Sequence, residues 1–426
     1  MQKSLAGVVA ALLGAATMVC ADDAVDVQEQ LRLLQQQNQQ MQEQLNKQQQ
    51  LIDSLTRKVA EFQNAGQTPE AEAAKPAALS KVVISGEGGL AFFESGRDGQ
   101  YPDAAFRVDE AKLFVDAQIW KDIYFFGELD LTTREQEDDN LSLGELYVDF
   151  ENVSRLWGVE RLVNVRAGRF DIPFGEEYLV RDAIDNPLIS HALSDIWGID
   201  EGVELYGSLG KAQYTVAVQN GGTPSVQDYD ADKAVVGRVD YDATRWLHLS
   251  ASAMRTGNIA VEGDEYAALW FGGTQLRSIG PSATTTTFHA ELYEGDVQVR
   301  WPRGHLKAAG GYLHYDDNNT AANDNRDVYY YYVEGLYDVT AKLYLAMRFS
   351  QIRADDGFPI VGNGEYDEYA EEELTTDLWQ LDIGGGYQFN PNLTLKMDYA
   401  FEQGREVGGD ERNHENQFAI ELAFRI

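Results

Sequence analysis

The sequence predicts an all-β fold: a 16-stranded antiparallel transmembrane β-barrel preceded by an α-helical coiled coil. Three observations lead to this prediction. Apolar and polar residues alternate with period two through most of the chain from Val82 to Ile426. The connections between the candidate strands are alternately short and long. The last nine residues, Phe418 to Ile426, form the most regular strand of the series.

This final strand separates two kinds of side chain. Large apolar residues would share one face, and small or charged residues would share the other: Phe418, Ile420, Leu422, Phe424 and Ile426 against Ala419, Glu421, Ala423 and Arg425. In a membrane barrel the last strand closes the ring, because an open edge in lipid would leave backbone groups without hydrogen bonds. We therefore expect this strand to pair with the first strand of the barrel.

The N-terminus has the pattern of a secretory signal peptide at residues 1–21. Lys3 supplies a positive charge, Leu5 to Val19 is an Ala-rich apolar run, and Val19-Cys20-Ala21 fits a cleavage site. Cleavage there would remove the chain's single cysteine, and with it disulfide and cysteine-metal chemistry. Lipidation of Cys20 is the alternative interpretation of this segment.

Residues 22–63 predict a periplasmic coiled coil. Apolar residues recur in steps of four and three over about five heptads, at Val27, Leu31, Leu34, Met41, Leu45, Ile52, Leu55, Val59 and Phe62, with the polar Asn38 and Gln48 also on the seam. A helix with such a stripe should associate with copies of itself. The alternative is a Gln-rich spacer without structure. Residues 64–81, with Gly66, Pro69 and Pro76, are expected to be a flexible linker to a barrel at residues 82–426.

The composition excludes several classes of protein. The 70 Asp and Glu residues against 34 Lys and Arg residues give a net charge of -36, so nucleic acid is not an expected partner. The mean hydropathy of -0.39 and the lack of a later long apolar run exclude a helical membrane protein. The 22 Tyr, 18 Phe and 7 Trp residues fit the aromatic girdles of a membrane barrel. A large β-sandwich would also be rich in tyrosine, but the length of residues 82–426 argues against it.

The alternation and the turn residues between its runs define the candidate strands. They are Val82–Phe93, Ala104–Ile119, Ile123–Leu131, Leu141–Glu151, Leu162–Phe170, Gly202–Leu209, Ala212–Gln219, Lys233–Tyr241, Leu247–Arg255, Phe288–Val299, Leu306–Tyr315, Val328–Asp338, Leu343–Ile352, Asp377–Phe389, Leu393–Phe401 and Gln417–Ile426. A barrel of this size is wide enough for an aqueous channel. Because the inward faces of the strands are polar, we expect the lumen to hold water.

The segment from Asp171 to Glu201 is the most distinctive connection. It contains apolar residues that would be unfavourable in bulk water, namely Leu179, Ile184, Leu188 and Ile196. We expect this loop to fold into the barrel and to narrow the pore, since long ordered loops are often functional. A surface flap or a contact between subunits is the alternative. The expected lining residues of the constriction are Glu176, Glu177, Arg181, Asp182 and Asp185 on the loop, and Lys112, Glu110, Glu128, Asp130 and Arg166 on the wall.

Two stretches resemble the phosphate-selective porin O/P family. Val165 to Gly175 resembles the family's signature of a glycine, a phenylalanine and a Pro-Phe-Gly turn, and Phe106-Arg107 with Ala111-Lys112-Leu113 resembles its second strand. The resemblance implies an outer-membrane trimer of 16-stranded barrels, with an N-terminal coiled coil in several relatives. The chain departs from the family at Asp109 and Glu110, where arginines are usual. Carboxylates in a pore favour cations, so we expect a weak preference for cations.

The sequence therefore predicts a porin of the bacterial outer membrane, a passive channel for small hydrophilic solutes or ions. The expected partners are outer-membrane lipid, two further copies of the chain and, through the coiled coil, the cell wall. The alternative function is a structural one, in which the coiled coil tethers the membrane to the cell wall. No enzyme motif such as H-E-x-x-H or G-x-S-x-G occurs, no cofactor is indicated, and the six histidines show no metal-binding spacing.

Overall fold

The structure is a computed structural model that describes residues 82–134, 141–224, 227–228, 231–261, 266–279, 284–319, 321 and 324–426. The chain divides into two units, Met1–Pro76 and Ala77–Ile426, and the described residues belong to the second. The predicted signal peptide, coiled coil and linker lie outside the described residues. Within the described residues, no helix is long and apolar enough to cross a membrane.

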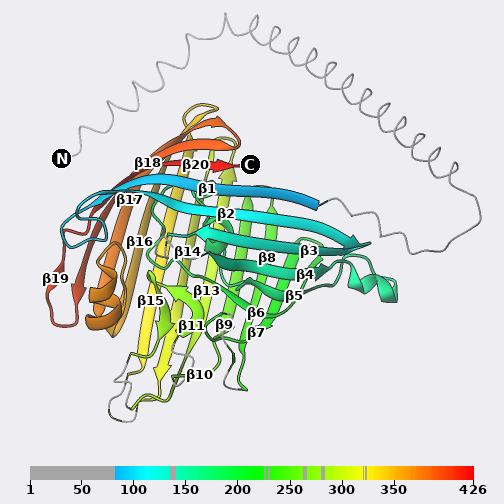
Figure 1. Ribbon diagram of the computed structural model, residues 1–426, viewed down its shortest axis with the longest axis horizontal. Helices are drawn as coiled ribbons and strands as arrows, with labels where there is room; N and C mark the ends of the chain where they lie inside the picture. The colour runs from blue at the N-terminus through cyan, green and yellow to red at the C-terminus, as the bar shows by residue number, and fades with distance from the viewer. Residues whose placement is uncertain are drawn as a thin grey trace, which may run out of the picture. The chain divides into compact units, whose positions relative to one another are not determined.

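The described residues form the predicted 16-stranded antiparallel barrel (Figure 1). Every strand expected from the alternation is present. The barrel strands are β1 (Val82–Ser95), β2 (Ala105–Trp120), β3 (Ile123–Thr132), β4 (Ser142–Phe150), β5 (Asn164–Asp171), β6 (Trp197–Leu209), β7 (Ala212–Gln219), β8 (Ala234–Thr244), β9 (Leu247–Arg255), β13 (Thr287–Trp301), β14 (Gly304–Asp317), β15 (Arg326–Asp338), β16 (Leu343–Phe358), β17 (Thr375–Asn390), β18 (Leu393–Glu406) and β20 (Gln417–Arg425).

The final strand closes the ring, as the sequence predicts. β20 pairs with β18 on one side and with β1 on the other, where the register runs from Glu87 opposite Arg425 to Ser95 opposite Gln417. Figure 1 shows β18, β20, β1 and β2 side by side. Because every barrel strand has two neighbours, none of them presents an open edge.

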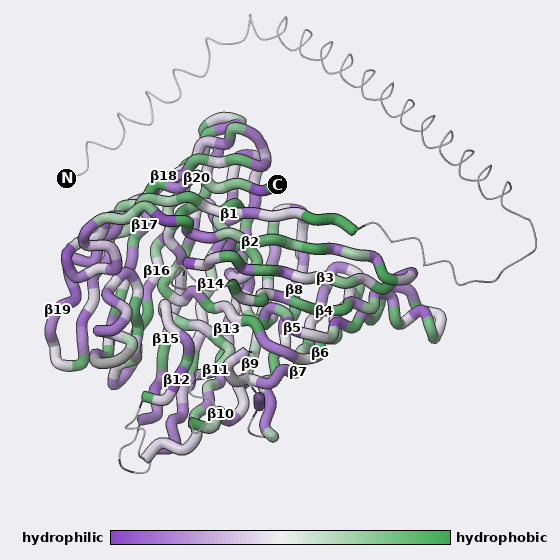
Figure 2. The backbone as a smooth tube through the Cα atoms, in the orientation of Figure 1, coloured by the Kyte–Doolittle hydropathy of each residue, from purple (hydrophilic) through white to green (hydrophobic). Residues whose placement is uncertain are grey.

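Polar side chains lie on the inner face of the strands and apolar side chains on the outer face, as predicted. On β18, Lys396 and Asp398 point inward and are each 2% exposed, whereas Met397 between them points outward and is 54% exposed. β16 repeats the pattern, with Arg348 inward and Met347 outward. Figure 2 shows the resulting alternation of hydrophobic and hydrophilic residues along the strands. The outer face is therefore the apolar surface that a barrel presents to lipid.

Exposed aromatic side chains lie at both borders of this apolar surface. Tyr293 and Trp301 face outward on β13, eight residues apart, and Tyr329 and Tyr337 do the same on β15. At about 3.3 Å per residue and a strand tilt of about 40°, each pair spans roughly 20 Å along the membrane normal, close to the height of the apolar band of outer-membrane barrels. The spacing supports the predicted aromatic girdles.

The long connections contain structure that the sequence analysis did not predict. They carry four short strands, β10 (Ile259–Ala260), β11 (Tyr266–Phe271), β12 (Thr274–Arg277) and β19 (Glu411–Arg412), and the short helices η2 (Glu177–Val180) and η3 (Glu368–Glu372); η1 (Val153–Trp157) lies in the β4–β5 connection. β11 pairs with the start of β6, where Trp270 lies opposite Trp197. This pairing extends β6 to Trp197, five residues before the predicted start. Strands this short have no period-two pattern of their own.

Candidate functional site

The loop between β5 and β6, residues 172–196, lies inside the barrel, and we refer to it as the inner loop. Two glycines of the sequence motif, Gly168 within β5 and Gly175 at the start of the loop, occupy positions that disfavour a larger side chain. Gly168 has φ 139°, and a Cβ there would lie 2.3 Å from the carbonyl oxygen of Leu146. Gly175 has φ 64°, and a Cβ would meet the carboxylate of Glu294 at 2.3 Å. Phe170 and Phe174 are fully buried between them.

The inner loop first contacts the wall formed by β8 and β9. The amide of Gly175 donates to Ser252 Oγ at 3.0 Å, and Arg238 donates to the Gly175 carbonyl oxygen at 2.9 Å and to Tyr178 Oη at 2.8 Å. His248 Nε2 lies 2.5 Å from Glu176 Oε1. The start of the loop is therefore held on this wall by both backbone and side-chain contacts.

The loop then crosses the lumen to β2. Lys112 Nζ lies 2.6 Å from Asp182 Oδ1, and the amide of Ala183 donates to Glu110 Oε1 at 2.6 Å. Asp185 Oδ2 then forms an ion pair with Arg425 of β20, at a distance of 2.7 Å. In the ring, β2 and β9 are separated by six strands on one side and eight on the other. Between residues 176 and 182 the loop therefore crosses from one side of the barrel to nearly the opposite side.

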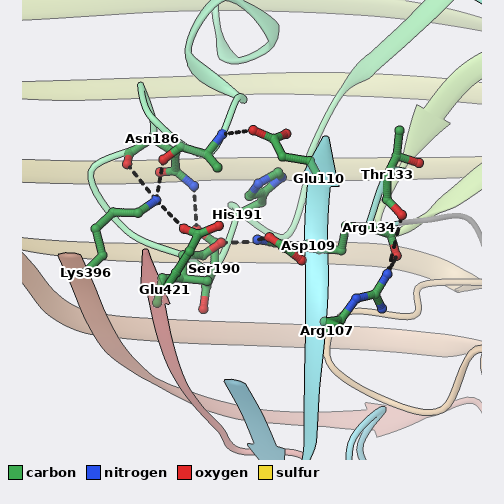
Figure 3. A network of polar contacts seen from close by, with 12 residues as sticks. Arg107, Asp109, Glu110, Thr133, Arg134, Asn186, Ser190, His191, Lys396 and Glu421 are labelled. Carbon is green, nitrogen blue, oxygen red and sulfur yellow. Dashed lines mark hydrogen bonds and ion pairs between the residues drawn. The ribbon is translucent and has the colours of Figure 1, made fainter. Parts of the chain in front are cut away.

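The rest of the inner loop lies against β15 to β18, where charged side chains of the wall bind its backbone (Figure 3). Lys396 donates to the carbonyl oxygens of Ala183 at 2.5 Å and Leu188 at 3.0 Å, and its Nζ lies 2.6 Å from Glu421. Asp398 Oδ2 accepts from the amides of Ile189 and Ser190, both at 2.8 Å.

These contacts correct one expectation from the sequence. The inward faces of β16 and β18 are polar, as predicted, but they do not line open water. Ser350 is 0% exposed and Asp398 is 2% exposed because the inner loop covers them. A charged inward side chain can bind a loop backbone as well as water, and alternation alone does not distinguish the two.

Three other long connections contact one another and the inner loop on this side of the barrel. They join β9 to β13, β16 to β17 and β18 to β20. The amide of Gly272, between β11 and β12, donates to the Ser194 carbonyl oxygen at 2.8 Å, and the amide of Val361 donates to the Gly272 carbonyl oxygen at 2.9 Å. Arg412 of β19 donates to the carbonyl oxygen of Ile360 at 2.5 Å. Beneath them lies an apolar cluster with residues of the inner loop and of β8 to β17, among them Ile172, Leu193, Ile196, Leu269, Phe271 and Ile352.

Two open spaces border the inner loop. The first is lined by β1, β2, β17, β20 and the β16–β17 connection, and the second by β2 to β6. A cavity of about 1180 Å³ lies between the mouth and the inner loop, and one of about 670 Å³ lies between the loop and the wall of β2 to β5. Arg134, His191 and Trp270 line both cavities, so the two adjoin. A third cavity of about 290 Å³ lies against η2 and the wall of β7 to β15. The first two cavities form the candidate pathway through the mouth.

Carboxylates outnumber basic groups in the described lining of the 670 Å³ cavity. The acidic side chains are Asp109, Glu110, Glu128, Asp130, Glu145, Asp171 and Asp182, and the basic ones are Lys112, Arg134, Arg169 and Arg181. Several of these charges are paired. Arg134 forms an ion pair with Asp109, and Arg181 binds Asp195 of the inner loop through two hydrogen bonds of 3.0 and 3.1 Å. Lys112 also lies 3.6 Å from Glu128.

Several titratable groups on the inner loop have shifted pKa values, and two of these shifts change the charge of the group near neutral pH. Burial lowers the pKa of His191 to about 4, so this histidine is neutral at physiological pH. Burial and the neighbouring Asp195 carboxylate raise the pKa of Glu177 to about 7. His191 therefore adds no charge to the pathway, and Glu177 is only partly ionised at neutral pH.

The structure places the expected constriction residues in different positions. Six of them line the 670 Å³ cavity, namely Glu110, Lys112, Glu128, Asp130, Arg181 and Asp182. Glu176 lines the third cavity, and Asp185 pairs with Arg425. Glu177 faces the inner loop itself and accepts from Ser194 Oγ at 3.1 Å, and Arg166 lies between Asp149 at 3.4 Å and Glu204 at 3.5 Å.

Several further residues line this cavity that were not among the expected constriction residues. Glu145 accepts from the amide of Asp171 at 3.0 Å, and Arg169 and the stacked pair of Trp197 and Trp270 complete the cavity wall. Arg169 belongs to the motif that the sequence analysis quoted, so its position gave a usable signal. Trp270 lies in β11, a short strand within a long connection, and its pairing with Trp197 depends on tertiary structure.

The barrel is similar to solved outer-membrane proteins. The outer-membrane channel DcaP of Acinetobacter baumannii has a TM-score of 0.54 and 12% identity, covering 83% of this chain and 99% of its own. OmpT of Vibrio cholerae has a TM-score of 0.54 and 10% identity, with coverage of 83% and 99%. An anion-selective porin from Comamonas acidovorans has a TM-score of 0.50 and 10% identity, covering 81% and 98%.

Sequence comparison adds no closer relationship. No protein-family model matches the chain, and no curated protein matches it. At identities of 10 to 12% the likeness to solved structures concerns the fold. The chain therefore has the fold of the 16-stranded outer-membrane porins.

Proposed function

We propose that the protein is an outer-membrane porin, a channel for passive diffusion of small hydrophilic solutes or ions, with the inner loop as its constriction. The observation that carries the proposal is the pair of adjoining cavities, about 1180 and 670 Å³, which border the inner loop and are lined by β1, β2, β17 and β20 and by β2 to β6, respectively. The inner loop crosses the lumen beside this pathway and is bound to the wall at both sides of the crossing. A barrel that served only as an anchor would need neither the cavities nor a bound loop.

The outer surface supports a location in the outer membrane. The apolar belt between two rows of exposed aromatic side chains matches the surface that barrels present to lipid. We further propose that residues 1–21 are a signal peptide, that residues 22–63 form a periplasmic coiled coil, and that the barrel, residues 82–426, associates as a trimer. These proposals come from the heptad pattern and from the resemblance to the phosphate-selective porin O/P family.

We also propose membership of that family in the broad sense, without its selectivity. The supporting feature is the motif from Val165 to Gly175, in which Gly168 and Gly175 adopt positive φ angles that favour glycine. The opposing feature is the charge of the pathway. Asp109 and Glu110 lie in the lining where the family usually has arginines, and carboxylates exceed basic groups around them. We therefore propose a weak preference for cations and no tight phosphate site.

Single-channel recording in a planar bilayer tests this proposal. The expected results are stable conductance and a reversal potential, under a salt gradient, that favours cations at low salt and fades at high salt, since the Debye length shrinks. The double variant Glu128→Gln with Asp130→Asn removes two lining carboxylates and should shift the reversal potential towards anions. The matched control, Glu151→Gln with Glu160→Gln, removes two exposed carboxylates near the short turns and should not.

Two outcomes would overturn the proposal in different ways. Absence of conductance from a correctly folded barrel would mean that the protein is not a channel, and the tethering function would then be preferred. Strong anion selectivity, with phosphate blocking the chloride current, would mean that the basic residues Lys112, Arg134, Arg169 and Arg181 dominate the pathway.

A further inference from the structure

We propose that Glu176, Asp240 and His248 form a binding site for a divalent transition-metal ion of the zinc class. The three residues come from the inner loop, β8 and β9, and lie outside the cavities of the proposed pathway. One ligand atom of each lies within 4.8 Å of the ligand atoms of the other two. One imidazole nitrogen and two carboxylate oxygens are a donor set that zinc prefers, with water completing the tetrahedron.

The orientation of His248 carries this inference. Its Nδ1 lies 2.8 Å from Asp242 Oδ1, and its Nε2 lies 2.5 Å from Glu176 Oε1 and 4.0 Å from Asp240 Oδ1. When Nδ1–H donates to Asp242, the lone pair of Nε2 points at two carboxylates. This is the arrangement in which a carboxylate fixes the tautomer of a metal-binding histidine. Either a second proton on His248 or a bound cation must then occupy the space between Nε2 and the two carboxylates.

A third carboxylate in the same cavity supports the cation. Asp296 of β13 lines the 290 Å³ cavity together with Glu176, Asp240 and His248. It is 7% exposed, Ser250 donates to its Oδ2 at 3.1 Å, and its Oδ1 has no N–H or hydroxyl donor among the described residues, although the Glu294 carboxyl also interacts with Asp296. A buried oxygen without a donor is costly unless a water or an ion satisfies it. Asp296 is thus placed to accept from a metal-bound water.

The basic side chains near the site are fewer than its carboxylates, so the site has a net negative charge. Arg238 lies 3.2 Å from Asp240 and also donates to Gly175 and Tyr178 of the inner loop. Arg300 and Lys307 also line the cavity, and Arg300 donates to Gln298 at 2.8 Å. Of the cations, only Arg238 contacts a ligand directly. Four carboxylates, Glu176, Asp240, Asp242 and Asp296, lie in or next to the site, so a divalent cation would reduce the imbalance.

Bound metal would tie the start of the inner loop to β8 and β9. Zinc bonds to nitrogen and oxygen are about 2.0 to 2.2 Å long, so Glu176 and His248 would move slightly apart and Asp240 would move closer. The site lies at the end of the loop segment that crosses the lumen. Metal binding is therefore expected to restrict the motion of that segment and to add positive charge next to its first residues.

Zinc titration of the metal-free, folded, full-length protein tests the proposal. Isothermal titration should give one zinc ion per chain, and cobalt substitution should give the visible absorption of a four-coordinate site. His248→Gln should weaken zinc binding at least tenfold, and Asp242→Asn, a positioning variant, should weaken it roughly 10- to 100-fold. The matched control is His314→Gln, because His314 Nδ1 also lies 2.8 Å from a carboxylate, that of Asp327, and belongs to no described metal-ligand cluster.

Folding of each variant is checked by its heat-dependent mobility in gel electrophoresis. Zinc that binds equally well to wild type, His248→Gln and the double variant Glu176→Gln with Asp240→Asn would overturn the assignment. So would the absence of stoichiometric binding to the folded wild type. Neither result depends on conductance, so the site and the channel function are tested separately.

Discussion

Replacing Lys396 by methionine should release part of the inner loop from the wall. The ammonium group of Lys396 donates to two loop carbonyl oxygens within 3.0 Å and pairs with Glu421 at 2.6 Å, and the two side chains are 1% and 0% exposed. Methionine keeps the length and the apolar part of the side chain. The substitution therefore removes the charge and the donors with little change in packing.

The expected cost follows from the burial of the pair. Removing one partner of a buried ion pair typically costs about 3 to 5 kcal/mol, because the remaining charge is left uncompensated. If the loop bears this cost, its detached state becomes roughly 140 to 3,700 times more populated relative to the bound state, at tenfold per 1.4 kcal/mol. The barrel strands keep their backbone pairing, so the variant should still fold.

Single-channel recording of Lys396→Met should show larger and noisier currents than wild type. The double variant Lys396→Met with Glu421→Gln is the control, because removing both charges leaves neither partner of this pair charged. This variant should restore much of the low current noise of the wild type. If Lys396→Met folds and its conductance and noise equal those of wild type, the loop is not held by this network and the reasoning fails.

Four further results are expected. Gly175→Ala should loosen the base of the inner loop, since alanine at φ 64° costs about 1 to 2 kcal/mol and its Cβ would meet Glu294, so single-channel noise should rise; unchanged noise would contradict this. Truncation of Phe424 to Ile426 should reduce the yield of folded barrel, because Phe424 and Arg425 pair with Gly88 and Glu87 of β1; a normal yield would refute the closing role of β20. Replacing Glu176, Glu177, Asp182 and Asp185 together by Gln or Asn should shift the reversal potential towards anions, but less than the number of charges implies, since only Asp182 of the four lines the 670 Å³ cavity; a shift towards cations would contradict the assignment. Deletion of residues 22–81 should weaken a trimer without preventing insertion of the barrel, as measured by native mass; a purely monomeric full-length protein would exclude the seam.

Much of the barrel could be predicted because its signal is local. On β18, the alternation of Lys396, Met397 and Asp398 assigns each side chain to a face without knowledge of any other strand. The position of β20 as the closing strand also followed from its own pattern. The entry of the inner loop was predicted from its length and its apolar residues, and from the motif around Gly168 and Gly175.

The course of the loop inside the barrel could not be predicted. Asp398 binds the amide of Ile189, which is 209 residues away in the chain, and nothing in the alternation of β18 distinguishes this carboxylate from one that faces water. The same applies to Glu176 and His248, which are 72 residues apart and meet only because the loop folds onto β9. Contacts of this kind depend on which wall a loop reaches, and sequence spacing carries no information about that.

Thiol modification of single cysteines during single-channel recording tests the central claim most directly, namely that ions pass along β2 to β5 beside the inner loop. With Cys20 replaced, a cysteine is placed at Glu128, which lines the 670 Å³ cavity, or at Ser350, which is fully buried beneath the loop. The account predicts that a charged, water-soluble thiol reagent changes the current through Glu128→Cys and leaves Ser350→Cys unaffected. Rapid modification of Ser350→Cys with no effect at Glu128→Cys would place the pathway on the opposite wall and contradict the account.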